Sequence, residues 1–175
     1  AKQDMFLTGT KEDTEEVLIN TQSDSLYIDV KQVTIPQNFK SYDDDLYYNE
    51  KEVFEEDYIS LNVIRKADVK TPYLIIKKEA KGYNQPIQLT VPVEIIGNKI
   101  LVPNYFKYSY NERMRHYNAN YELVVPRHFK VIDVSDKINL DDDNDDDDNI
   151  DDNSGITVEE NKIKINGTTI EYNSD

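Results

Sequence analysis

Hydrophobic and polar residues alternate along several stretches of this chain with the period of a β-strand. Within residues 25–35, Leu26, Ile28 and Val30 fall on one side, while polar residues and a tyrosine fall between them. A period of two is typical of a strand with one solvated face. Pro36 ends the pattern. The stretch therefore predicts a half-buried strand.

The same pattern predicts further strands downstream. Residues 58–65 place Ile59, Leu61 and Val63 on one side, and residues 72–78 form another apolar run. Residues 87–134 are the densest apolar stretch and are rich in Val, Ile, Tyr and Phe, which favour pleated surfaces. Within that stretch, the dipeptide at 97–98, Gly-Asn, predicts a hairpin turn.

The remaining segments are shorter or more polar. Residues 37–57 are rich in tyrosine and acids, and Asn49 and Glu52 have the spacing of a helix N-cap and its capping-box partner. That spacing is compatible with one helical turn over residues 50–56. Near the end of the chain, three short strands are predicted at 156–158, 162–165 and 169–172, and Asn166-Gly167 between the last two is a strong hairpin signal.

These patterns predict an all-β chain with four parts. Residues 1–16 are a lead-in, 17–134 the β core, 135–154 an acidic tract, and 155–175 short strands that pack on the core. Two layouts fit many short strands with no convincing helix of three turns. One is a β-solenoid of stacked coils and the other is a β-sandwich.

Composition limits the function classes. The net charge is −15, and nine Asp lie within residues 141–153, so the charge without them would be −6. Phosphate binding needs clustered Lys and Arg, which argues against a nucleic-acid partner. The chain has no cysteine, which excludes disulfides, thiolate metal sites and a cysteine nucleophile.

The acidic tract is the first candidate site. Carboxylates are ligands for hard cations such as Ca²⁺, and Asp141, Asp143 and Asp145 occupy alternate positions. The EF-hand pattern is not met, because its sixth position is Asp146 instead of Gly and its twelfth is Asp152 instead of Glu. Two interpretations remain: a solvated, self-repelling linker or a weak divalent-cation site.

Tyrosines are the second candidate. The chain has 13 tyrosines and no tryptophan, and Tyr105, Tyr108, Tyr110 and Tyr117 form a predicted binding surface. Tyrosine combines a large apolar ring with a hydroxyl and is enriched at interfaces. The alternative is that these rings make cross-strand pairs that stabilise a sheet. The only two histidines, His116 and His128, lie in no recognisable catalytic pattern.

The sequence from Tyr121 to Val134, YELVVPRHFKVIDV, follows the blocks PYLIIKKEAKG from Pro72 and GNKILVPNYF from Gly97. In that order, over roughly residues 58–134, they resemble the extracytoplasmic C-terminal domain of Bacteroidetes membrane proteins that carry a phage-shock-protein-C (PspC) domain. They are also similar to adhesin-like β-solenoid domains. The nearly pure Asp/Asn tract departs from that family's pattern. The resemblance implies a periplasmic, non-enzymatic module tethered through membrane segments outside this sequence.

The expected function is therefore a non-catalytic binding or structural domain of an envelope membrane protein, of the stress-response type, with a protein partner in the cell envelope. No cofactor is expected beyond weakly bound Ca²⁺. The alternative is a Ca²⁺-dependent adhesin or a carbohydrate-binding module. Calcium affinity distinguishes the two. Extracellular modules bind Ca²⁺ with Kd values of about 0.1–1 mM, so a Kd tighter than about 1 mM favours the alternative.

Overall fold

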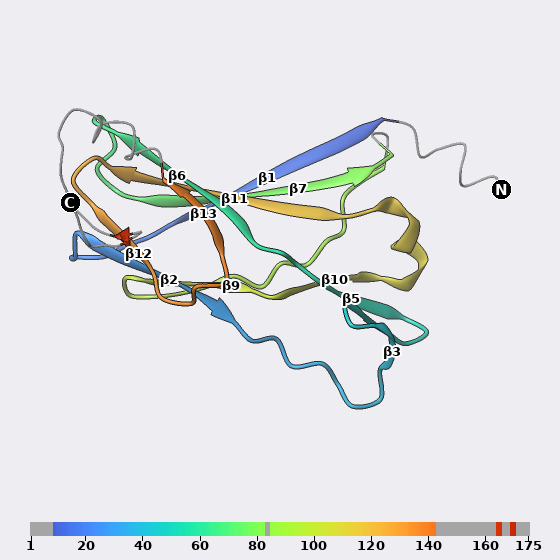
Figure 1. The fold of residues 1–175 in the computed structure, drawn as a ribbon. Helices are drawn as coiled ribbons and strands as arrows, with labels where there is room; N and C mark the ends of the chain where they lie inside the picture. Colours follow the sequence, from blue (N-terminus) through green and yellow to red (C-terminus); the bar gives the residue numbers. More distant parts are fainter. Residues whose placement is uncertain (1–8, 83–84, 143–163, 166–168, 171–175) are drawn as a thin grey trace.

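A computed structural model describes residues 9–82, 85–142, 164–165 and 169–170. The regular secondary structure of the described chain is almost all β-strand, which confirms the all-β prediction. Figure 1 shows two layers of strands that face each other, with a smaller sheet extending from one end of the lower layer. None of the helices in these residues is long and apolar enough to cross a membrane.

The upper layer is a five-stranded mixed sheet. Its order is β1 (Thr10–Leu18), β7 (Tyr73–Lys81), β11 (Asn118–Pro126), β6 (Ser60–Lys66) and β13 (Asn139–Asp142). The pairs β1–β7 and β7–β11 are antiparallel, whereas β11–β6 and β6–β13 are parallel. β11 is buried along most of its length, as expected for a central strand.

The lower layer is a four-stranded sheet. Its order is β12 (Lys130–Asp133), β2 (Ser25–Lys31), β9 (Lys99–Pro103) and β8 (Glu94–Ile96). β8 and β9 are the hairpin predicted around Gly97, whose φ of +60° suits a residue without a Cβ. Leu26 and Ile28 of β2 are fully buried, as the alternation predicts.

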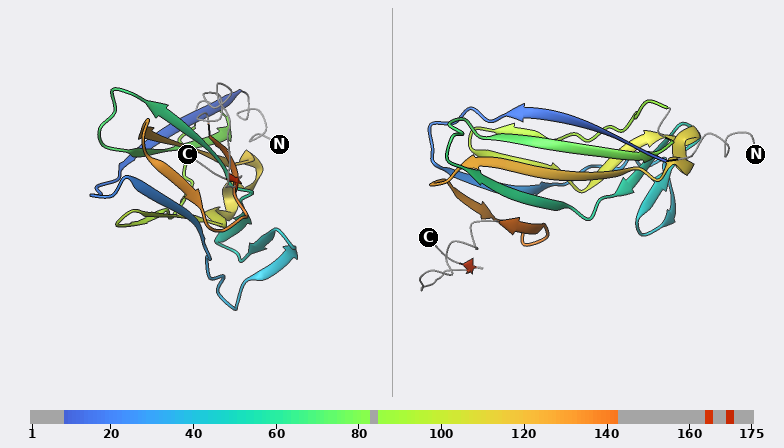
Figure 2. Two further views of the ribbon diagram at one scale, coloured as in Figure 1. Left: turned by 60° about the vertical axis from the view of Figure 1, so that its left-hand side comes forward. Right: turned by 90° about the horizontal axis from the view of Figure 1, so that it is seen from above.

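The third sheet is smaller and projects from the body of the molecule (Figure 2, left). Its order is β10 (Tyr105–Ser109), β5 (Glu52–Glu56), β4 (Leu46–Tyr48) and β3 (Lys40–Asp43), and all its pairs are antiparallel. The predicted helical turn at 50–56 is wrong. Asn49 Oδ1 does accept the backbone N–H of Glu52, at 2.7 Å, but the chain continues as β5 instead of a helix.

Two short segments complete the described chain. The 3₁₀ helix η2 (Tyr110–Arg115) joins β10 to β11. β14 (Lys164–Ile165) and β15 (Thr169–Ile170) pair antiparallel, as the Asn-Gly signal predicts. The predicted strand at 156–158 lies outside the described residues, and so does any packing of 155–175 on the core.

The predicted solenoid is not found among the described residues. Coils of a solenoid pair mainly with the next coil along the chain. Here β2 lies between β9 and β12, which follow it by about 70 and 100 residues, and β1 pairs with β7. Strand β1 also begins at Thr10, so part of the predicted lead-in is an edge strand.

One asparagine, between β9 and β10, ties the small sheet to the lower four-stranded sheet. The backbone N–H of Asn104 donates to Lys31 at 3.1 Å, and its carbonyl accepts the Asp57 N–H at 2.8 Å. Its side-chain oxygen also accepts the N–H of Val33 at 2.9 Å. These bonds fix the small sheet relative to the lower four-stranded sheet, because Asp57 follows β5 directly and Lys31 ends β2.

Candidate functional site

The small sheet has one buried face and one outward face. Val53, Phe106 and Tyr108 are buried in the common core, at 1%, 3% and 5% exposure. Neighbouring side chains of a strand point to opposite faces, so Phe54 and Tyr105 lie on the outward face. The cross-strand pairs agree, because Phe54 lies opposite both Tyr47 and Lys107.

Four aromatic rings gather on this outward face, and all four are half-buried. Two edge-to-face pairs form, with centroids 5.2 Å and 5.9 Å apart. The first pair is Phe39 with Phe54 and the second is Tyr47 with Tyr105. We call these four residues the aromatic face. Tyr47 of β4 and Phe54 of β5 are directly opposite cross-strand neighbours, Tyr105 comes from β10, and Phe39 directly precedes β3.

A cation already rests on this face. The Lys107 ammonium nitrogen lies 5.9 Å from the Phe54 ring centroid and 3.2 Å from a carboxylate oxygen of Glu52. The positive charge is thus attracted by the ring and by the carboxylate at once.

Four carboxylates flank the other end of the aromatic face, and we call them the acidic rim: Asp43, Asp44, Asp45 and Glu56. The Tyr58 hydroxyl donates to Asp45 at 2.8 Å, and the Glu56 N–H donates to the Asp45 carbonyl at 2.8 Å. Partial desolvation, then a hydrogen bond with Asp45 and repulsion by neighbouring acids, raise the pKa of Glu56. Within the described ranges, no rim carboxylate forms an ion pair with Lys or Arg, so this end of the face carries uncompensated negative charge.

The four predicted tyrosines do not form one surface. Tyr105 belongs to the aromatic face, but Tyr108 and Tyr117 are each only 5% exposed and their rings lie 5.1 Å apart in the core. Their hydroxyls donate to Glu55 at 2.7 Å and to Glu112 at 2.6 Å. Tyr110 is half-buried and packs against the core. Tyr108 and Tyr117 are therefore core residues, but their contact is not the cross-strand pair of the alternative interpretation, because Tyr117 precedes β11 and β10 and β11 belong to different sheets.

The acidic tract enters the described structure only at its beginning. Asp141 is an exposed residue of β13, and Asp143 and Asp145 lie outside the described residues. The engaged carboxylate is Asp142, which accepts two hydrogen bonds from Arg65. Among the residues that the structure describes, no group of three His, Cys, Asp or Glu is placed to hold a metal ion.

Asp57 is a buried carboxyl beside the small sheet. It is 8% exposed and accepts a hydrogen bond from the Tyr121 hydroxyl at 3.4 Å. Burial, offset in part by that hydrogen bond, raises the pKa of Asp57 to about 7. Its partner Tyr121 is a core residue at 1% exposure, so this pair is enclosed in the protein.

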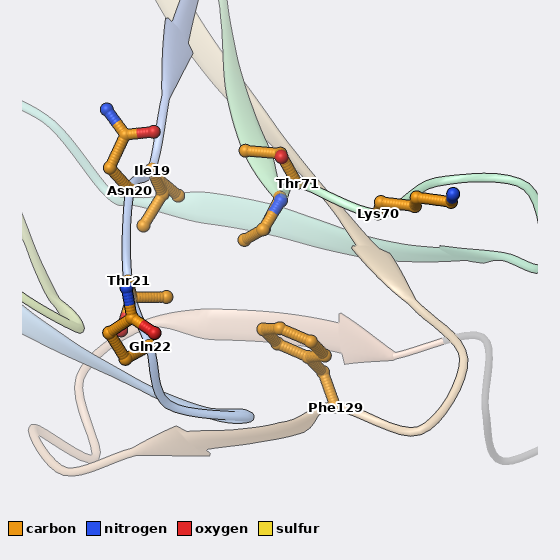
Figure 3. A pocket seen from close by; sticks show the side chains of 8 residues that line it. Ile19, Asn20, Thr21, Gln22, Lys70, Thr71 and Phe129 are labelled. Carbon is orange, nitrogen blue, oxygen red and sulfur yellow. The ribbon is translucent and has the colours of Figure 1, made fainter.

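A shallow cavity of about 250 Å³ lies at the far end of the two large sheets (Figure 3). The β1–β2 loop supplies Asn20, Thr21 and Gln22, while Lys70 lines it from the β6–β7 loop and Phe129 from the loop after β11. The two histidines do not meet in this cavity or elsewhere. His116 precedes β11 and His128 follows it, and a nine-residue strand is about 30 Å long.

Phe39 and Phe54 were not predicted from the sequence. A signal for Phe54 was present, because Val53 and Phe54 are consecutive residues of high β-propensity between acids. It could not show which of two hydrophobic neighbours faces outward, since that depends on the partner strands.

Comparison of the chain with protein-family models, curated proteins and solved structures finds no match in any of the three.

Proposed function

We propose that this chain is a non-catalytic binding domain of the cell envelope that holds a partner protein on its aromatic face. The observation that carries the proposal is the gathering of Phe39, Tyr47, Phe54 and Tyr105 on the outward side of one sheet. Contiguous aromatic surface rimmed by polar groups marks interaction sites, and tyrosine and phenylalanine are enriched in interface cores.

We infer that the two large sheets form a β-sandwich. One cluster of buried side chains draws residues from both sheets, including Leu26 and Ile100 from one and Leu61, Leu74 and Leu123 from the other. Sheets that share one core in this way hold their backbones rigidly. A rigid body suits a domain that presents a fixed surface, because less conformational entropy is lost on binding.

The envelope location rests on the resemblance of residues 58–134 to the extracytoplasmic domain of PspC-domain membrane proteins. In that location the membrane tether lies in segments beyond this sequence, and the partner is another envelope protein. Fusion of the chain, within its full-length gene product, to a reporter enzyme that is active only in the periplasm tests the location. Reporter activity supports it, and a reporter active only in the cytoplasm contradicts it.

The binding role is tested by affinity capture from the envelope fraction of the source cells. The test variant Tyr47→Ser/Phe54→Ser/Tyr105→Ser removes most of the aromatic face. The control variant Leu18→Ser/Ile96→Ser removes comparably hydrophobic side chains that are 61% and 57% exposed on other strands. A protein retained by wild type and control but lost with the test variant supports the proposal. Equal retention by all three contradicts it.

The second candidate is a Ca²⁺-dependent adhesin or carbohydrate-binding module. The observation that favours it is the exposed carboxylate of Asp141, at the point where β13 leads into the acidic tract. Calorimetric titration separates the two candidates. A Kd for Ca²⁺ tighter than about 1 mM, within the range of extracellular modules, supports the second candidate.

A further inference from the structure

The aromatic face and the acidic rim together define the chemistry of the partner. We propose that the outward face of the β10-β5-β4-β3 sheet binds a basic segment of a partner protein, with an Arg or Lys side chain placed against Tyr47 and Tyr105. This inference rests on the proposed binding function and adds the charge of the ligand.

Charge complementarity is the first argument. Glu56 lies opposite Tyr105 in the β10–β5 pairing, and Asp45, whose carbonyl accepts the Glu56 N–H, lies next to it. Asp43 ends β3 and Asp44 follows it, and none of these four acids is in an ion pair within the described part of the chain. The Tyr58 side chain, 73% exposed, adds a third tyrosine through its hydrogen bond to Asp45. Aromatic rings beside uncompensated carboxylates attract cations in two ways that add: by the cation–π interaction with the ring and by the charge of the carboxylate.

The same sheet supplies an internal example of this chemistry. Lys107 contacts the Phe54 ring and the Glu52 carboxylate, at 5.9 Å and 3.2 Å. Tyr105 lies two residues before Lys107 on the same strand and face, opposite Glu56 of β5. The ring and carboxylate pairing therefore occurs twice along this face, and in the second instance the described chain provides no cation.

The ligand is expected to dock on the face of the sheet, because the free edge is poorly suited to pairing. Strand β3 is the edge, and its pairing with β4 is interrupted between Ser41 and Asp43. All four residues of β3 are exposed, and Tyr42 is 75% exposed. Bulges and charges on an edge strand oppose the addition of another strand.

The probe is an N-acetylated peptide of alternating Ser and Arg, and its control replaces every Arg by citrulline, which has nearly the same shape but no charge. Binding is measured by fluorescence anisotropy near physiological ionic strength. We expect the Arg peptide to bind and the citrulline peptide to bind at least about fivefold more weakly.

Variants then locate the binding site. Asp45→Asn/Glu56→Gln is expected to weaken binding about fivefold, and Tyr105→Leu, which keeps an apolar side chain but removes the ring, about threefold. The charge-matched control Asp13→Asn/Glu16→Gln alters exposed residues of β1 and is expected to change binding less than twofold. Thermal unfolding of each variant verifies that it is folded, and the single variants Asp45→Asn and Glu56→Gln provide a second test.

Three results would overturn the inference: no binding of the Arg peptide by wild type, equal binding of both peptides, or equal losses in the rim and β1 variants. If affinity capture still depended on Tyr47, Phe54 and Tyr105, the proposed binding function would be retained and the partner would be one without the basic segment. If affinity capture did not depend on these three residues, both the binding function and the basic ligand would be rejected.

Discussion

Arg65 holds Asp142 through two parallel hydrogen bonds, each 2.9 Å long, from Nε to Oδ1 and from Nη2 to Oδ2. The Arg65 side chain is only 6% exposed, and it also donates to the carbonyls of Arg127 and Phe129. One guanidinium therefore fastens the edge strand β13 to β6 and to the loop after β11. Asp142, the second aspartate of the Asp-rich region, thus has a structural role.

Replacement of Arg65 by Lys should destabilise the protein even though the charge is kept. Lys cannot form the two-point contact, so at least one oxygen of Asp142 and one backbone carbonyl lose their donor. We expect the free energy of unfolding to fall by about 2 kcal/mol, measured by urea denaturation. A loss below about 0.5 kcal/mol would show that the pair is an ordinary surface ion pair.

Asp57 should make stability depend on pH. Its pKa is about 7 in the folded protein and near 4 when unfolded, so between these values the folded state holds a proton that the unfolded state has released. The unfolding free energy therefore falls as pH rises from about 4 to about 7 and the carboxylate becomes costly to bury.

Asp57→Asn should remove that contribution, because the amide oxygen still accepts from Tyr121 and carries no charge. Relative to wild type, the variant is expected to gain about 3 kcal/mol between pH 4 and pH 8. Urea denaturation at several pH values checks this. Parallel pH profiles for the two proteins would contradict the burial of an ionisable group at this position.

Tyr117 and Tyr42 should respond differently to loss of the hydroxyl. The buried Tyr117 hydroxyl donates to Glu112 at 2.6 Å, so Tyr117→Phe is expected to cost about 1–2 kcal/mol of unfolding free energy. Tyr42 is 75% exposed, and Tyr42→Phe should change stability by less than about 0.5 kcal/mol. Equal effects would mean that Tyr117 is not the core residue described above.

Binding of the Arg peptide should weaken as pH falls. The pKa of Glu56 is raised, chiefly by partial desolvation and by its hydrogen bond with Asp45, so Glu56 becomes neutral at a higher pH than an ordinary glutamate. Its attraction for a cation is lost as that proton binds. Anisotropy titrations at descending pH should show this loss for wild type, and a smaller one for Glu56→Gln. An unchanged affinity at the acidic end would exclude Glu56 from the contact.

The sequence predicted those strands whose side chains alternate between core and solvent. Leu26 and Ile28 of β2, or Leu61 and Val63 of β6, reveal their burial by spacing alone. Strand β1 could not be predicted in this way, because most of its side chains are exposed and its pairing with β7 defines it. A solenoid is likewise distinguished from stacked sheets only by long-range pairings such as β2 with β9. Local hydrophobic periodicity does not reveal such pairings.

The candidate site was predictable only in part. The abundance of tyrosine indicated an aromatic surface, and Tyr105 does lie on one. Tyr108 belongs to the same strand but lies three positions after Tyr105. Side chains an odd number of positions apart on a strand point to opposite faces, so Tyr108 points into the core. The face also needs Phe54 of β5 and Phe39, which directly precedes β3, and their contact is a product of the tertiary structure.

Chemical-shift mapping shows directly where a basic peptide binds. The ¹⁵N-labelled protein is titrated with the Ser–Arg peptide and the amide signals are followed. The largest changes are expected in β4, β5 and β10, around Tyr47, Glu56 and Tyr105, with the end cavity near Thr21 and Lys70 unaffected. Signal changes concentrated at that cavity, with none in the small sheet, would contradict binding on the aromatic face.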